Sequence, residues 1–523
     1  MPPKTNYEYQ QDMPFSREPL KTLYVWQRLF TTIVMVPGWV LYYAVQPRSS
    51  RPRASWSLKQ IVAVNFMRRI FKVTELAGVT WCTRDPSVEC DNRKLKYTRF
   101  EWVDPLPIEL RTGIVADPQV PFKRVGTFVW PKESPPTIPH SSGDSQDVLV
   151  NQGDEESEAG KVPLIGIFLH GGGYCHMSAH EKASTSKIPH RLIKDKTFTE
   201  IHAVEYRLLQ HAPFPAAVQD AATVYAHIVR RYQRRPANSS SLSQQSSTTD
   251  TLHNSAEKPS YLTANCTEQT KLKKENDAIR HRVMEAARNM RCKIILIGDS
   301  AGGNLVLALA RWIRDEGLLP PPEGLLLLSP SCDPSHAFPE PPSSYIPRPH
   351  GGTDYLVDTP EPARCCSAPS WGTTRSRRCT APFAQTVADL TIARLDTAVI
   401  RHLRSLESVP ITPPIMPSAE LDPPSTANVD LERSPTSLAH PVIASPRGLS
   451  LFSEFPRVCV VLGDAERLER EVMKLVGAME RDGVVVRTVW VEDGVHDVLM
   501  MGWWDERVRD RVWASVQDWV RGV

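Results

Sequence analysis

The sequence predicts an α/β fold in which helices cover both faces of a mostly parallel sheet. Short apolar runs such as residues 294–297 and 325–328 lack polar alternation, as expected for strands buried on both faces. Stretches with helical spacing, such as residues 215–231 and 304–315, alternate with these runs. This alternation is typical of βαβ units, whose parallel strands are joined by helices.

The elements follow one another through a chain that three polar stretches interrupt. The expected strands are residues 125–130, 164–169, 201–204, 293–297, 325–328, 458–462 and 484–491, and the further helix is 468–481. Residues 133–160, 237–274 and 336–439 are rich in Ser, Pro or acidic side chains, and we expect them to be disordered inserts. Residues 96–523 therefore form one large domain rather than several.

Composition excludes some classes of function. The net charge is +3 over 523 residues, which gives no case for nucleic-acid binding. The ten cysteines are scattered without paired C-x-x-C spacing, so neither a zinc site nor a disulfide framework is expected. Adjacent Cys365 and Cys366 are interpreted as plain thiols. We expect no metal and no organic cofactor.

The N-terminal region has the pattern of a membrane-associating segment, residues 1–55. Residues 29–47 carry no charge and would just cross a hydrocarbon core of roughly 30 Å. Pro37-Gly38 is expected to interrupt this stretch, so a tilted or re-entrant anchor competes with a full span. Residues 56–95 are expected to form amphipathic helices, because basic and apolar side chains recur at helical spacing over residues 56–76. The alternative to membrane contact is that these helices pack on the core as a cap.

A pentapeptide predicts the nucleophile. Gly298-Asp299-Ser300-Ala301-Gly302 follows an apolar strand and precedes a helical pattern, which is the context of a nucleophile elbow. The flanking glycines leave room for a tight turn that forces an unusual backbone angle at Ser300. Ser300 is therefore the predicted nucleophile.

A second glycine-rich motif predicts an oxyanion hole. His170-Gly171-Gly172-Gly173 ends the strand at residues 164–169, where glycines allow backbone N–H groups to turn toward a developing oxyanion. The N–H of Ala301 would complete the hole. A plain glycine-rich turn is the alternative; a phosphate cradle is disfavoured because no Lys-Ser/Thr pair follows.

The base and the acid are expected near the C-terminus. His496 lies in Asp493-Gly494-Val495-His496-Asp497, on a loop after the strand at residues 484–491, where a general base is expected. Asp464 and Glu466 lie on the loop after the preceding strand, and spacing alone does not choose between them as the acid. The chain order of serine, acid and histidine is the one used by α/β-hydrolases.

Several segments between residues 163 and 497 resemble the hormone-sensitive-lipase-like group of α/β-hydrolases, which includes arylacetamide deacetylases and fungal steryl-acetate esterases. Besides the motifs above, the resemblance is carried by Tyr206-Arg207-Leu208, Phe214-Pro215-Ala216-Ala217 with Asp220, Ser329-Pro330 with Asp333, and residues 463–471. Two features depart from the group: Leu-Gln-His-Ala follows Leu208 where Ala-Pro-Glu-His is usual, and the third insert is unusually long.

The resemblance implies specific residue roles. The group's acid stands in an Asp-x-Leu pattern, which here is filled by Glu466 before Arg467 and Leu468, with Asp464 as the alternative. Gly172 and Gly173 would donate to the oxyanion together with Ala301. The resemblance further implies an N-terminal cap over the site and an endoplasmic reticulum anchor, in which case the sequons at Asn238 and Asn265 would be open to glycosylation.

The sequence thus predicts a membrane-associated serine esterase that cleaves small-acyl esters of apolar alcohols. An amide deacetylase or peptidase with the same triad is one alternative, and a non-catalytic ligand-binding protein of the same fold is another. A third is that residues 336–439 reflect mis-predicted coding sequence. The oligomeric state and the membrane topology stay open.

Overall fold

The computed structural model describes residues 15–133, 162–233, 285, 290–332, 350–356 and 451–523. The three expected inserts lie outside the described residues, except for residue 133 and the segment 350–356. Asn238, Asn265, Asp333, Cys365 and Cys366 also lie outside them. The expectation of disorder therefore stays a prediction for most of these stretches, whereas residues 350–356 have defined contacts that bear on the site below.

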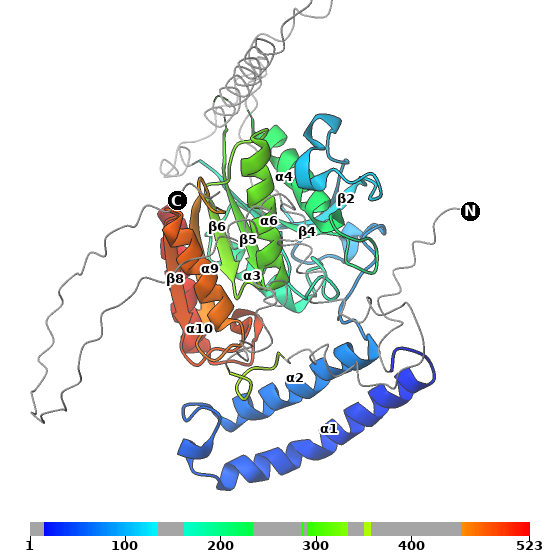
Figure 1. The fold of residues 1–523 in the computed structure, drawn as a ribbon, viewed down its shortest axis with the longest axis vertical. Coiled ribbons are helices and arrows are strands. Elements are labelled where there is room, and N and C mark those ends of the chain that lie inside the picture. The colour runs from blue at the N-terminus through cyan, green and yellow to red at the C-terminus, as the bar shows by residue number, and fades with distance from the viewer. Residues whose placement is uncertain (1–14, 134–161, 234–284, 286–289, 333–349, 357–450) are drawn as a thin grey trace, which may run out of the picture.

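Within the described residues, one sheet of eight strands forms the centre of the molecule (Figure 1). Its spatial order is β1-β2-β4-β3-β5-β6-β7-β8; β2 is antiparallel to both of its neighbours, β1 and β4, and all other adjacent pairs are parallel. The strands are β1 (Arg99–Val103), β2 (Val125–Trp130), β3 (Leu164–Leu169), β4 (Glu200–Glu205), β5 (Lys293–Asp299), β6 (Gly324–Leu328), β7 (Arg457–Gly463) and β8 (Val486–Val491).

The described helices are α1 (Leu20–Val45), α2 (Leu58–Ala77), α3 (Lys187–Lys194), α4 (Ala216–Tyr232), α6 (Ala301–Glu316), α9 (Glu469–Arg481) and α10 (Glu506–Arg521). Among them, α3, α4, α6 and α9 lie between strands in the chain, whereas α1 and α2 precede the first strand and α10 follows the last. Short 3-10 turns occupy Arg48–Ser50, Asn92–Lys94, Ile108–Leu110, Gly113–Val115, Ser184–Ser186 and Val498–Met500.

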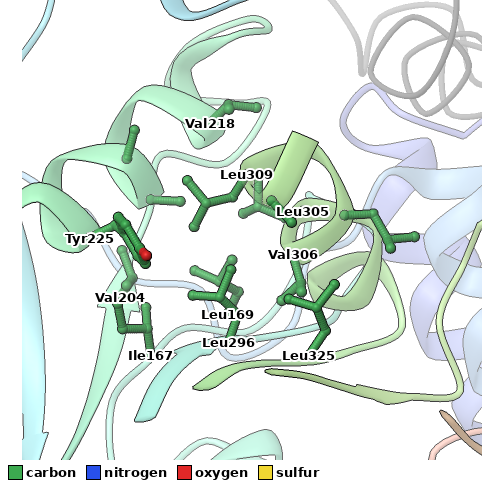
Figure 2. Close-up of a cluster of buried hydrophobic side chains, with 14 of the residues drawn as sticks. Ile167, Leu169, Val204, Val218, Tyr225, Leu296, Leu305, Val306, Leu309 and Leu325 are labelled. Atoms are coloured by element: carbon green, nitrogen blue, oxygen red, sulfur yellow. The ribbon is translucent and has the colours of Figure 1, made fainter. Parts of the chain in front are cut away.

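Successive strand residues point into two different cores, because side chains alternate across a sheet. On one face, Leu296 of β5 packs with residues of α4, α6 and α9. On the other face, its neighbours Ile295 and Ile297 pack with residues of α2, α3 and α10. Figure 2 shows the first of these cores, where Leu305 and Leu309 of α6 lie over Leu296 and the neighbouring strands. The predicted α/β class, with helices on both faces of a mostly parallel sheet, is confirmed.

The chain reverses its direction of travel across the sheet between β3 and β5. From β3 it moves to β4 on one side, and β5 then pairs with β3 on the other side. In open α/β sheets, sites form at the carboxyl ends of strands at such a switch point. The glycine-rich motif after β3 and the elbow after β5 both lie there.

The expected elements are present with small shifts at their ends, and some elements were missed. Helix α6 begins at the residue after Ser300 rather than at residue 304, and β8 begins at residue 486 rather than 484. The sequence did not predict β1, α3 or α10. Strand β1 lies at one edge of the sheet, whereas α3 and α10 contribute buried residues to the second core.

The expected interruption of the N-terminal apolar stretch is wrong. Helix α1 runs from Leu20 to Val45 without a break at Pro37-Gly38. A proline inside a helix removes one backbone hydrogen bond, and here the helix continues past it while packing along α2. This helix is long and apolar enough to cross a membrane.

Helices α1 and α2 form a hairpin beside the sheet domain, with α2 nearer to it (Figure 1). Helix α2 begins with a capping box between Ser57 and Gln60 and ends at Gly78 in the left-handed conformation. The Arg69 guanidinium of α2 donates to the hydroxyls of Thr31 and Thr32 in α1, each over 3.0 Å. Because α2 also contributes to the second core, the hairpin is attached to the sheet domain.

Candidate active site

Ser300 lies on a strained turn between β5 and α6. Its φ of 50° and ψ of −118° fall in a region that non-glycine residues rarely adopt. The Ser300 N–H donates to the Leu328 carbonyl over 2.9 Å, and the Ser300 carbonyl accepts from the Ser331 N–H over 2.9 Å. These two bonds hold the serine at the carboxyl edge of the sheet.

Glycine is required on both sides of this turn because the backbone is so closely packed. A Cβ at Gly302 would lie 1.9 Å from the Leu169 carbonyl oxygen, and one at Gly298 would lie 2.3 Å from the Gly302 oxygen. No side chain fits at these distances. The first turn of α6 therefore lies directly against the end of β3.

His496 lies within hydrogen-bond distance of Ser300. Its Nε2 is 2.9 Å from the Ser300 Oγ, and its side chain is almost fully buried. Two residues predicted from separate motifs, 196 positions apart, thus meet. An imidazole at this distance can remove the hydroxyl proton as the oxygen attacks a carbonyl.

Glu466 is buried in the same region. Its Oε2 accepts from the Ser329 hydroxyl over 2.7 Å and from the Gly463 N–H over 3.2 Å. Its Oε1 and the Nδ1 of His496 are both buried without a hydrogen-bond partner in the part of the chain that the structure describes. These are the two atoms that a catalytic triad would join. Burial raises the pKa of Glu466 to about 8, and the nearby His496 opposes that rise.

Asp464, the alternative acid, faces a different partner. Its carbonyl oxygen accepts from the Arg53 guanidinium, and its carboxylate Oδ1 is 3.8 Å from the same group. Its side chain is 38% exposed. Burial raises the pKa of Asp464, and Arg53 partly offsets the rise. Of the two candidates from the sequence, Glu466 is thus the one in the buried environment of His496.

Two further carboxylates close to His496 were missed by sequence reasoning. Asp497 Oδ2 lies 3.1 Å from the His496 Nε2. Asp354, fully buried in the segment 350–356, accepts from the Arg467 N–H over 2.7 Å. Asp497 adjoins the histidine in its motif and could have been considered, whereas nothing sets Asp354 apart in a proline-rich stretch.

The carboxylates govern the protonation of His496. Burial alone lowers the pKa of the imidazole, but the charges of Asp497, Glu466 and Asp354 outweigh burial and raise it. The ring of Tyr355 also lies beside His496, with the two ring centroids 6.0 Å apart. The base form of His496 is therefore favoured only at a higher pH than for an ordinary histidine.

The motif after β3 lies directly against the nucleophile. A Cβ at Gly171 would be 3.0 Å from the Ser300 Cβ. The Gly171 N–H donates to the Asp299 Oδ1 over 3.0 Å. That N–H is thus already used, and it orients the motif rather than binding an oxyanion.

The predicted oxyanion donors have unused backbone N–H groups. Gly172 and Gly173 have φ values of 105° and 58°. Neither glycine nor Ala301, at the first position of α6, donates its N–H to any partner among the described residues. Free N–H groups beside a nucleophilic serine can bind the negative oxygen of a tetrahedral intermediate.

The contacts of His170 stabilise the glycine-rich motif and do not make His170 a reacting group. Its Nδ1 lies 2.8 Å from the Gly171 carbonyl oxygen, and its own carbonyl accepts from the Tyr206 hydroxyl over 2.6 Å. The rings of His170 and Tyr206 are stacked, with their centroids 4.3 Å apart. Burial lowers the pKa of His170 to about 4, so the ring stays neutral.

A buried ion pair fixes the segment that follows β4. Arg207 and Asp220 lie 2.8 Å apart, and the Asp220 carboxylate also accepts the Arg207 N–H. This pair attaches residues 206–208 to α4.

Among the residues that the structure describes, no group of three or more His, Cys, Asp or Glu side chains is arranged to hold a metal ion.

Comparisons with known proteins agree with this architecture. A family model described as the alpha/beta hydrolase fold matches residues 166–401, a range that includes the elbow and the glycine-rich motif. The expected α/β-hydrolase fold is thereby confirmed, in line with the resemblance to the hormone-sensitive-lipase-like group. No curated protein is similar enough in sequence to match the chain.

Solved structures of several esterases resemble the chain at low identity. A hormone-sensitive lipase from a metagenome library has 16% identity, covering 76% of this chain and 82% of that one, with a TM-score of 0.39. An esterase of Pyrobaculum calidifontis has 15% identity, with coverages of 82% and 87% and a TM-score of 0.39. A fungal esterase from Rhizomucor miehei has 13% identity, with coverages of 89% and 96% and a TM-score of 0.41. These values are too low for the substrates of those proteins to bear on this chain.

The carboxylate beside His496 leads to a prediction about pH. Asp497→Asn removes a negative charge that raises the pKa of His496, so the base form should persist to lower pH. We expect the acidic limb of the pH profile for covalent labelling by a fluorophosphonate to move down by about one pH unit. Glu492→Gln, on the same loop but largely exposed, serves as the control. An unmoved acidic limb in Asp497→Asn would show that this carboxylate does not govern His496.

Proposed function

Because the chain has the α/β-hydrolase fold and its sequence motifs resemble those of the hormone-sensitive-lipase-like group, we propose that it is a carboxylic ester hydrolase. Ser300 is the nucleophile and His496 the general base. The observation that carries the proposal is the 2.9 Å approach of His496 Nε2 to Ser300 Oγ on a strained elbow. Two motifs far apart in the sequence have no structural need to meet in this way.

The reaction proceeds by two acyl transfers. His496 takes the Ser300 proton while Oγ attacks the ester carbonyl, and the N–H groups of Gly172, Gly173 and Ala301 hold the resulting oxyanion. His496 then gives the proton to the alcohol oxygen, and the carbon–oxygen bond breaks. Water attacks the acyl-serine with His496 again as the base, which releases the carboxylic acid and restores the serine.

Glu466 is the proposed third member of the triad. It is fully buried, whereas the side chain of Asp464 is partly exposed beside Arg53. Ser329 and Gly463 hold one oxygen of Glu466 and leave the other without a partner among the described side chains. If that oxygen accepted the Nδ1–H of His496, the ring proton would be held on Nδ1, and Nε2 would be left to act as the base.

The proposed substrates are small-acyl esters, such as acetyl esters, of apolar alcohols. Support comes from helix α1, most of which projects apolar side chains into solvent. The exposed ones are Leu20, Leu23, Trp26, Leu29, Phe30, Ile33, Val34, Met35, Val40, Leu41, Tyr42 and Val45. An exposed apolar surface of this kind is typical of contact with a membrane, in which apolar esters dissolve.

Helix α1 is proposed to lie in the plane of the membrane surface. At about 1.5 Å per residue it is long enough to span, but it lies beside α2, which carries Arg68, Arg69 and Lys72. A span with the hairpin intact would take these charges into hydrocarbon, at a large cost in free energy. The side of α1 that faces away from α2 can enter the interface without that cost. Placement at the endoplasmic reticulum rests on the resemblance alone.

Substitution of the nucleophile tests the proposed function. Ser300→Ala and His496→Ala should each lower hydrolysis of p-nitrophenyl acetate by a factor on the order of 10³ or more, because each removes a reacting group. Fluorophosphonate labelling should vanish with the activity while circular dichroism stays unchanged. Hydrolysis of p-nitroacetanilide instead of the ester would favour an amide deacetylase. A wild-type chain that neither labels nor hydrolyses would favour the ligand-binding protein.

The choice of acid is tested by a matched pair of variants. Glu466→Gln should lower kcat by a factor on the order of 10² to 10⁴, as expected when the group that orients the base loses its charge. Asp464→Asn keeps the backbone carbonyl that Arg53 contacts and should cost less than about tenfold. The opposite ranking would make Asp464 the acid.

Membrane contact is tested with vesicles of phosphatidylcholine and phosphatidylserine. The triple variant Leu23→Ser, Phe30→Ser, Leu41→Ser should reduce co-flotation at least about tenfold, because each side chain loses transfer free energy of order 1.5–3 kcal/mol. All three side chains are exposed in the protein, so the unfolding temperature of the triple variant should equal that of the wild type. Ile108→Ser with Val485→Ser, exposed apolar residues of the sheet domain, is the matched control. Undiminished flotation of the triple variant would contradict the proposal.

A further inference from the structure

Residues 46–57, here called the N-terminal linker, join α1 to α2 and contact both loops that carry the proposed acid and base. The acid loop is residues 463–468, and the base loop is residues 491–497. We propose that Arg53 of this linker is a positioning residue. It holds the two loops at the relative position that Glu466 and His496 need for reaction at Ser300. This inference rests on the proposed function and extends it to a part of the chain far from the triad in sequence.

One guanidinium contacts both loops. Arg53 Nη2 donates to the carbonyl oxygen of Asp464 on the acid loop. Its Nη1 lies 3.7 Å from the Asp493 carboxylate on the base loop. The planar, permanently charged guanidinium presents several donors in fixed directions, which suits it to bridge two separate acceptors.

Neighbouring linker residues hold the same aspartate. The Ser55 hydroxyl donates to the Asp493 carboxylate, and the Trp56 Nε1 donates to the Asp493 carbonyl over 3.1 Å. Trp56 is itself buried and packs edge-on against Trp504, with centroids 5.6 Å apart. Asp493 precedes His496 by three residues and has a φ of 55°. Three linker side chains thus fix a strained residue close to the base.

The two loops approach each other so closely that their charges need compensation. The Ala465 N–H donates to the Gly494 carbonyl over 3.0 Å, which joins the loops directly. This brings the carboxylates of Asp464 and Asp493 near each other, and Asp493 adds to the rise in the pKa of Asp464. Arg53 lies between these like charges. Without it, their repulsion would separate the loops that carry Glu466 and His496.

The linker is also attached to the membrane-facing helix. Arg51 donates to the Trp56 carbonyl and to the Tyr43 carbonyl in the last turn of α1, each over 3.2 Å. The position of α1 is therefore connected through the linker to both loops. If Arg53 had only a structural role, it would contribute a partly exposed ion pair, whose loss would lower stability slightly and leave kcat unchanged.

Kinetics of Arg53 variants in the full chain separate positioning from stability. Arg53→Ala should lower kcat for p-nitrophenyl acetate by about 10- to 100-fold with little change in KM, as expected for displaced catalytic groups. Arg53→Lys should have a higher kcat than Arg53→Ala but a lower one than the wild type. Lysine keeps the positive charge, but its single ammonium group does not present the two separate nitrogens with which Arg53 contacts the two loops. Arg48→Ala is the matched control, since Arg48 lies on the same linker, is exposed, and makes no ion pair with any described residue.

A double-mutant cycle identifies the partner. If Arg53 acts through Asp493, then Arg53→Ala should cost little more once Asp493→Ala is present, and losses that simply add would overturn the proposal. It is also overturned if Arg53→Ala keeps wild-type kcat, or if both Arg53→Ala and Arg53→Lys lose activity only in proportion to a lowered unfolding temperature. Failure of the proposed function looks different, because the wild type and Ser300→Ala would then be equally inactive.

Discussion

The close approach of α6 to the end of β3 is the constraint on which the site depends. The turn at Ser300 has no room for a side chain at Gly302, so the serine, the glycine-rich motif and the helix N-terminus occupy one small volume. Backbone strain at Ser300 persists because buried strands and helices on both sides fix the ends of the turn. The reactive arrangement is thus a consequence of packing in the sheet as much as of the side chains themselves.

Much of this architecture could be predicted from the sequence, for identifiable physical reasons. Continuous apolar runs such as β5 and β6 favour parallel strands, because both faces of such strands are buried and the runs are short. The elbow, the glycine-rich motif and the histidine loop were equally visible, since each needs particular residues at fixed spacing. The structure places Ser300 and His496 together, whereas the choice of acid rests on burial, which spacing does not encode.

What the sequence did not reveal depends on contacts between distant segments. Asp354 belongs to a short segment inside a proline-rich insert, and no sequence pattern indicates its burial or its contacts with Arg467 and Arg68. The contacts of Arg53 join positions more than 400 residues apart, which no local pattern encodes. Helix α1 continues through Pro37 and packs along α2, so the local signal for a break does not decide the structure here.

The carboxylates around His496 favour the imidazolium ion, and this has a consequence for energetics as well as for pH. In the proposed acyl transfer the histidine would become positively charged as the oxyanion forms, so fixed negative charges nearby would stabilise that ion pair more than they stabilise the resting site. The same charges trap the resting histidine in its protonated form when the medium is acidic. In the proposed reaction, the charges that stabilise the imidazolium therefore also withhold the base form from the resting site as the pH falls.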